Sequence, residues 1–275
     1  MSNRRKALFT DLDGTFLTDG KQIPPANKAA AEEMLKQGHQ IIIATGRPLP
    51  SAVIQARKLD LTKEGCFLIA YNGGVLYDTF HGKILFEKTI PAEYVWAITE
   101  EVNRRGMHLQ AYDREKVLVE PRCDNEIVRY YCGRIDMEFG VIESMRLLKE
   151  DPAKLLVIDR KDRGRLEDLQ MWIRERFDPA VDTFFSSVEF LEVVAKNLNK
   201  GNGLRMMAEI LQIPLADTVA IGDEENDVSM LKAAGIGCAM SNGSASAKAV
   251  ADYVTEKDNN NGGAAEAIRR FILEE

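Results

Sequence analysis

Short runs of apolar and often β-branched residues recur in the first and last thirds of the chain, and they predict buried parallel strands. The clearest runs cover residues 7–10, 40–44, 66–70 and 218–221. Between the first two runs lies a helical pattern over residues 24–37, with Ala26, Ala30 and Met34 on one face. Gly38 stands where a glycine commonly caps the end of a helix. The order strand, helix, strand predicts a β-α-β unit and therefore a parallel sheet.

The middle of the chain has a different pattern. Helices are predicted over residues 91–105, 125–134 and 164–176, and strands over residues 107–120 and 154–159. This mixture indicates a separate α+β unit inserted into an α/β domain, with boundaries near Phe86 and Phe190. We therefore predict a Rossmann-like, doubly wound parallel sheet as a discontinuous core domain of residues 1–86 and 190–275. The inserted α+β domain covers residues 87–189.

Composition and charge narrow the choice of partners. The formal charge is −7, from 36 basic and 43 acidic residues, and the basic residues form no long run, so we expect no nucleic-acid partner. No apolar stretch approaches the roughly 20 residues that span a bilayer, so we expect no membrane contact. The four cysteines are widely scattered, which favours the reducing cytoplasm. The three histidines are isolated, so a zinc site is not expected.

Polar residues follow three of the predicted strands at the point where each strand ends. The segments are Asp11-Leu12-Asp13-Gly14-Thr15, Thr45-Gly46-Arg47 and Gly222-Asp223. Because the carboxyl ends of parallel strands meet at one edge of a sheet, these segments should converge on one crevice. Asp11 and Asp13 are two residues apart, so their side chains should point the same way and repel each other. Mg²⁺ relieves such repulsion, and Asp223 can complete its ligands.

An Asp-x-Asp pair alone is weak evidence, because acidic pairs at strand ends often form turns or cap helices. Here Thr45-Gly46 and Lys200-Gly201 add hydroxyl, backbone and ammonium donors that suit phosphate. A single lysine such as Lys200 is ordinarily a solvated surface residue. Lys200, however, stands just before a predicted helix over residues 203–212, where an anion is favoured. The combination predicts a phosphate site beside the carboxylates.

Taken together, these residues resemble the four motifs of the haloacid dehalogenase-like (HAD) superfamily, in the same order. The nearest resemblance is to the Cof-type phosphatases, including the YidA-type sugar phosphatases. Asp11–Thr15 resembles the first motif, Thr45 the second, Lys200 the third, and Gly222-Asp223 with Asn226-Asp227 the fourth. The resemblance spans nearly the whole chain, since the insertion lies where Cof-type members carry their C2-type cap domain.

The resemblance implies a Mg²⁺-dependent phosphatase that hydrolyses phosphate monoesters of small metabolites, with sugar phosphates as the expected class. It implies that Asp11, kept ionised, attacks phosphorus to form an aspartyl-phosphate, while Asp13 protonates the leaving oxygen and later activates water. The implied metal ligands are the carboxylates of Asp11 and Asp223 and the backbone carbonyl of Asp13. The implied phosphate ligands are the backbone of Leu12 and Gly46 and the side chains of Thr45, Lys200 and Asn226.

Three further features have more than one interpretation. Asp227 could orient Lys200 without itself binding the metal ion or the phosphate, or it could cap the helix that follows it. Asn72, in Asn72-Gly73-Gly74, is a turn residue by default and a candidate substrate contact by its place after the strand at residues 66–70. Residues 16–23 indicate a small hairpin beside the nucleophile that could exclude water.

Two other functions remain open at this stage. A phosphosugar mutase would use similar residues but keep the phosphate on the sugar, and a binding or regulatory module would keep the fold without the chemistry. Intact Asp11, Asp13, Lys200 and Asp223 argue against the second. The sequence leaves open the metabolite, the cap residues that select it and the oligomeric state.

Overall fold

A computed structural model describes residues 4–123 and 125–274. Residues 1–3, 124 and 275, which the predicted domains include, lie outside the described part. The chain divides into two compact units. The first consists of Met1–Gly46, Gln55–Phe86 and Asn199–Glu275, and the second of Arg47–Ile54 and Glu87–Leu198.

The first unit is built on an eight-stranded sheet with the order β14-β13-β12-β1-β2-β3-β4-β5. The strands are β1 (Ala7–Thr10), β2 (Gln40–Ala44), β3 (Cys66–Ala70), β4 (Val75–Asp78), β5 (Lys83–Glu87), β12 (Thr218–Gly222), β13 (Ile236–Ala239) and β14 (Tyr253–Val254). Neighbours from β14 to β3 pair in parallel, which confirms the expected α/β class. β4 differs because it pairs antiparallel with β3. Only residues 71–74 connect the two strands, and this connection is too short for a parallel crossover.

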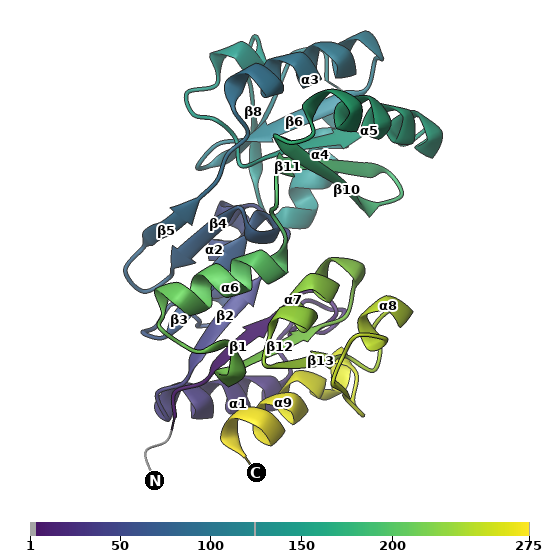
Figure 1. The fold of residues 1–275 in the computed structure, drawn as a ribbon. Helices are drawn as coiled ribbons and strands as arrows, with labels where there is room; N and C mark the ends of the chain where they lie inside the picture. Colours follow the sequence, from purple (N-terminus) through teal and green to yellow (C-terminus); the bar gives the residue numbers. More distant parts are fainter. Residues whose placement is uncertain (1–3, 124, 275) are drawn as a thin grey trace. The chain divides into compact units, whose positions relative to one another are not determined.

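Helices cover both faces of this sheet (Figure 1). They are α1 (Pro25–Lys36), α2 (Leu49–Lys58), α6 (Lys200–Ile210), α7 (Val228–Ala233), α8 (Ala245–Lys248) and α9 (Gly263–Ile268). Figure 1 shows α6 and α7 on one face and α1 and α9 on the other. Leu204 and Met207 of α6 belong to the same buried core as Phe9 and Ile42 of the sheet. The central strands are buried at nearly every position, and the apolar residues at helical spacing in α6 cover one of their two faces.

The second unit holds a six-stranded sheet with the order β10-β11-β9-β6-β7-β8. Its strands are β6 (His108–Tyr112), β7 (Lys116–Val119), β8 (Glu138–Val141), β9 (Lys154–Ile158), β10 (Val181–Ser187) and β11 (Phe190–Ala195), and its helices are α3 (Ala92–Arg104), α4 (Asn125–Ile135) and α5 (Arg163–Phe177). Ile98 of α3 and Leu169 of α5 share a core with Val157 of β9. The second unit extends to Leu198, beyond the predicted boundary near Phe190. The reason is that β11, which begins at Phe190, pairs with both β9 and β10.

The four cysteines form no disulfide bonds in the structure. Cys66, Cys123, Cys132 and Cys238 are all free thiols. Burial raises the pKa of Cys66 to about 11, so this thiol stays protonated near neutral pH. Within the described ranges, no helix combines the length and apolar character needed to cross a membrane.

Replacing Ile42 by alanine tests where the core lies. Ile42 is fully buried, so the replacement leaves a cavity, and we expect the free energy of unfolding to fall by about 2–5 kcal/mol. Ile210, at the end of α6, is 43% exposed, and the same replacement there should change it by less than about 0.5 kcal/mol. Urea unfolding followed by circular dichroism measures both. Equal losses at the two positions would contradict the assignment of Ile42 to the core.

Candidate active site

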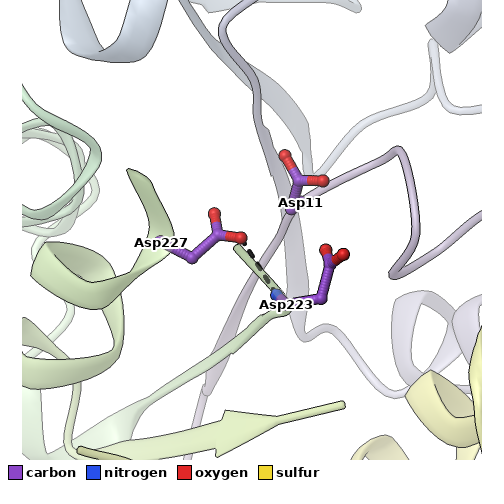
Figure 2. A group of neighbouring side chains, drawn as sticks. All are labelled: Asp11, Asp223 and Asp227. Atoms are coloured by element: carbon purple, nitrogen blue, oxygen red, sulfur yellow. Dashed lines mark hydrogen bonds between the residues drawn. The ribbon is translucent and has the colours of Figure 1, made fainter. Parts of the chain in front are cut away.

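Carboxylates from three segments meet at the carboxyl ends of β1 and β12. Asp11 directly follows β1, Asp223 directly follows β12, and Asp227 ends the short 3₁₀ helix Glu225–Asp227. One oxygen from each side chain lies within 4.8 Å of the others, and Figure 2 shows the three side chains around a common space. The Asp11 N–H donates to the Ile221 carbonyl at 3.0 Å, which ties the two strand ends together. The sheet order thus brings these distant segments to one place.

Lys200 is the cation of this group. Its side chain is fully buried, and Nζ lies 2.5 Å from Oδ1 of Asp11 and 2.6 Å from Oδ1 of Asp227. Lys200 is the first residue of α6, and the preceding Asn199 caps that helix by accepting a hydrogen bond from the Asn202 N–H at 2.8 Å. The helix start therefore fixes the position from which the ammonium reaches the carboxylates.

Asp227 makes the expected contact with Lys200, but its side chain does not cap the following helix α7 and bonds instead to the backbone before it. Its Oδ1 pairs with Lys200, while Oδ2 accepts hydrogen bonds from the backbone N–H groups of Asp223 and Glu224, both at 3.0 Å. These bonds orient the lysine and also close the turn that carries Asp223. Because both Asp227 oxygens are occupied in this way, Asp11 and Asp223 are the carboxylates better placed for a metal ion.

The carboxylate of Asp223 is held by the loop that follows Asp11. Thr15 Oγ1 donates to Asp223 Oδ1 at 2.6 Å. Gly14 has a φ of +82°, and a Cβ at this position would lie 2.4 Å from Asp223 Oδ2. Only glycine combines this left-handed backbone with such a close approach. Gly14 is therefore needed for Asp223 to lie against the Asp11 loop.

The side chain of Asp13 is not one of the three grouped carboxylates and has a different partner. Its Oδ1 is 2.7 Å from Nζ of Lys21, and the side chain is 37% exposed. Across residues 16–23 the structure has a turn closed by the Thr18 N–H and the Gln22 carbonyl at 2.8 Å, in place of the predicted hairpin strands.

The residues expected to bind phosphate fall into two groups. Lys200 belongs to the carboxylate group, whereas Thr45, Gly46 and Asn226 are connected through Asn72. The Asn72 N–H donates to the Thr45 carbonyl at 3.0 Å, and Asn226 Nδ2 donates to Asn72 Oδ1 at 3.3 Å. Leu12 is fully buried, and no acceptor for its backbone N–H is found in the described part of the chain. A buried, unbonded N–H suits an anionic ligand.

Two asparagines from the last third of the chain hold the loop after Asp11, and no pattern in the sequence indicates either role. Asn242 Nδ2 donates to the Gly14 carbonyl at 2.8 Å. Asn259 Nδ2 donates to the Leu17 carbonyl and to Asp19 Oδ1, both at 3.0 Å. The asparagine run at residues 259–261 by itself indicates only a loop, because such residues are typical of turns.

The protonation of the site reflects an excess of buried negative charge. Burial, with the added repulsion of Asp227 and Asp223, raises the pKa of Asp11 to about 8 although Lys200 opposes this. Burial likewise raises the pKa of Asp223 to about 6. Burial disfavours the charged form of Lys200, but attraction by Asp11 and Asp227 outweighs it and raises the pKa of this lysine. The protein's own groups therefore do not keep Asp11 fully ionised near neutral pH.

A divalent cation would correct this imbalance. Carboxylate oxygens are hard ligands of the kind Mg²⁺ prefers, and a nearby cation lowers the pKa of a carboxyl group. The group offers the oxygens of Asp11 and Asp223 within the 4.8 Å cluster. The donor set therefore fits Mg²⁺.

The α/β fold and its carboxylate–lysine site define an enzyme suited to an anionic substrate and a hard metal ion. The family model for haloacid dehalogenase-like hydrolases matches residues 8–268. This chain therefore belongs to the haloacid dehalogenase-like hydrolases, which confirms the resemblance stated from its motifs and the expected enzyme class of hydrolase.

Known proteins resemble this chain over nearly its full length. A solved haloacid dehalogenase-like hydrolase from Bacteroides thetaiotaomicron superimposes with a TM-score of 0.89 at 29% identity, covering 97% of this chain and 99% of that one. The HAD subclass IIB sugar phosphatase BT4131 gives a TM-score of 0.77 at 25% identity, covering 97% and 98%. The 5-amino-6-(5-phospho-D-ribitylamino)uracil phosphatase YcsE of Bacillus subtilis is 27% identical, covering 98% and 96%.

The raised pKa values predict that Mg²⁺ stabilises the protein more at higher pH. A carboxyl group with a raised folded-state pKa stabilises the metal-free fold at low pH, and this contribution is lost as pH rises through about 6 for Asp223 and about 8 for Asp11. Protons and Mg²⁺ compete for these oxygens. The rise in Tm on adding Mg²⁺ should therefore be larger near pH 8 than near pH 5, measured by differential scanning fluorimetry.

The matched control for this experiment is Asp223→Asn, which removes one of the two charges. It should shrink the Mg²⁺-dependent rise in Tm near pH 8. An equal rise at both pH values in the native protein would show that these carboxylates do not bind the ion.

Proposed function

We propose that this chain is a Mg²⁺-dependent phosphatase that hydrolyses phosphate monoesters of small metabolites through an aspartyl-phosphate on Asp11. The observation that carries the proposal is the buried contact of Lys200 with Asp11 at 2.5 Å, beside Asp223. In such an arrangement the ammonium attracts an anionic substrate to the space that the carboxylate of Asp11 faces. The relatives named as phosphatases support the same reaction.

In the proposed reaction, an oxygen of Asp11 forms a bond to phosphorus as the bond from phosphorus to the leaving oxygen breaks. Asp13 gives its proton to that oxygen, then takes a proton from the water that hydrolyses the aspartyl-phosphate. Asp13 now pairs with Lys21 at 2.7 Å, so it must exchange this partner for the leaving oxygen. Its exposed side chain leaves room for that rotation.

Other residues would hold the substrate and the metal ion. We assign the phosphate oxygens to the backbone N–H groups of Leu12 and Gly46 and to Thr45, Lys200 and Asn226, since these are the donors of the two groups described above. Mg²⁺ would be held by the carboxylates of Asp11 and Asp223 and the carbonyl of Asp13, and it would supply positive charge against the phosphoryl oxygens. Asp227 keeps Lys200 in place without touching the substrate.

Sugar phosphates are the substrate class that we propose. The support is the likeness to a named sugar phosphatase and to a phosphatase whose named substrate carries a phosphorylated ribityl chain. We propose that the inserted α+β unit acts as a C2-type cap domain that selects among such substrates. The four free thiols support a cytoplasmic location.

Release of inorganic phosphate from p-nitrophenyl phosphate and a panel of sugar phosphates tests the function. Asp11→Asn removes the nucleophile and should lower kcat by more than about a thousandfold. Asp168→Asn, an exposed change on α5, makes the same change of charge and should leave kcat unaltered. Chelation by EDTA should abolish activity and added Mg²⁺ should restore it.

Two results would contradict the proposal. Equal rates for native protein and Asp11→Asn would exclude the aspartyl-phosphate, and activity that is indifferent to EDTA would exclude the metal. A phosphosugar mutase would isomerise a sugar phosphate without releasing inorganic phosphate.

Asp227→Asn tests the orientation of Lys200 separately. The amide keeps the shape of the side chain but removes one of the two negative charges that hold the ammonium. We expect kcat/KM to fall by about tenfold to a hundredfold. The affinity for Mg²⁺, measured by calorimetry, should change much less, whereas an equal fall in both would indicate that Asp227 is itself a metal ligand.

A further inference from the structure

The turn after β3 has an unusual backbone. Tyr71, Asn72 and Gly73 have φ values of 51°, 55° and 111°, so three consecutive residues lie in the left-handed region. This conformation is unfavourable for residues other than glycine, and it persists only where the surroundings impose it. Such segments occur preferentially at functional sites. Contacts with neighbouring segments must therefore hold Tyr71 and Asn72 in this conformation.

Both neighbours of the turn belong to the candidate site. On one side, the Asn72 N–H donates to the carbonyl of Thr45, at the end of β2. On the other, a Cβ at Gly73 would lie 2.6 Å from the carbonyl oxygen of Asn199, the residue that caps α6 just before Lys200. The turn is thus wedged between the second and third motifs of the chain, and the close contact at Gly73 accounts for glycine there.

The side chain of Asn72 lies inside this junction and is 4% exposed. Its Oδ1 accepts a hydrogen bond from Asn226 Nδ2 at 3.3 Å, and its Nδ2 and Oδ1 lie 3.1 and 3.2 Å from a Cβ built at Gly46. With the bond to Thr45, Asn72 therefore contacts three of the residues that we assign to phosphate binding, which are Thr45, Gly46 and Asn226.

The amide nitrogen of Asn72 remains available as a donor. With Oδ1 facing Asn226, the two hydrogens of Nδ2 have no acceptor among the residues that the structure describes. A buried amide that gains an anionic acceptor there forms a charge-assisted hydrogen bond. An aspartate in the same place would instead turn a second negative charge toward the phosphate.

We propose that Asn72 is a phosphate-binding residue that donates through Nδ2 to the phosphoryl group and orients Asn226 through Oδ1. The strained turn over residues 71–73 then serves to aim this amide. The inference rests on the proposed function, since it takes the phosphate to lie between Thr45 and Asn226. It extends that function because Asn72 would hold the phosphoryl group itself. The sequence alone made Asn72 only a candidate contact for the substrate.

The competing explanation is that Asn72 only forms the turn, because asparagine tolerates left-handed backbone better than most residues. Asn72→Gly separates the two explanations. Glycine adopts the same φ without penalty, so the turn is kept while the amide is removed. Gln212→Gly is the matched control, because Gln212 has a φ of 54° in an exposed turn after α6.

The probe is inorganic phosphate, with Mg²⁺ present throughout. Its binding is measured by calorimetry and as competitive inhibition of p-nitrophenyl phosphate hydrolysis. For Asn72→Gly we expect the Kd and Ki for phosphate to rise about tenfold to a hundredfold, with Tm unchanged or higher. Asn72→Asp, which also tolerates left-handed backbone, should raise both constants further. Gln212→Gly should leave both constants as in the native protein.

The results that overturn the proposal are distinct from those that overturn the function. If native protein binds and releases phosphate while Asn72→Gly and Asn72→Asp bind it as tightly, Asn72 is only a turn residue and the phosphatase function stands. If Asn72→Asp binds phosphate more tightly than Asn72→Gly, the amide does not face the phosphate. If native protein neither binds nor releases phosphate, the proposed function and this inference fail together.

Discussion

The site depends on one buried cation, the ammonium of Lys200, which lies within 2.6 Å of carboxylates from two other segments. A buried charge that loses its partner typically costs about 3–5 kcal/mol, so neither Asp11 nor Asp227 is free to move away. The start of α6 and the ends of β1 and β12 are thereby held together by electrostatics as well as by the sheet. The same interaction orients the Asp11 oxygens, so the bond that stabilises this junction also positions the carboxylate that we propose as the nucleophile.

This junction is incomplete by its own charge balance. One ammonium faces three carboxylates, and burial raises the pKa of Asp11 and Asp223 to about 8 and 6. Either protons or a divalent cation must make up the difference, and only the cation leaves Asp11 ionised for attack near neutral pH. A formal charge of −7 is compatible with the proposed phosphate substrate, because the nearest charges outweigh distant ones.

Sequence reasoning succeeded where a fold-level rule applied and failed where a local detail depended on distant contacts. The convergence of Asp11, Asp223 and Lys200 follows from strand order and from the shared carboxyl edge of a parallel sheet. The pairing of Asp13 with Lys21 could not be predicted, because it depends on how the loop between these two residues turns back. No strand is predicted over β10 or β11, and a hydrophobic pattern does not say with which sheet a strand pairs, so the predicted domain boundary falls near Phe190.

The loop after Asp11 and the turn after β3 are each fixed by asparagine side chains, although they follow different strands. Asn242 and Asn259 bond the first, while Asn72 lies within the second. Fixed donors need no rearrangement as charge develops on a substrate, which is the main advantage of a preorganised polar site. The exposed pair of Asp13 and Lys21 is the exception, since its side chains are 37% and 56% exposed. In the proposed reaction the step that requires movement is therefore proton transfer by Asp13, whose side chain has to leave Lys21.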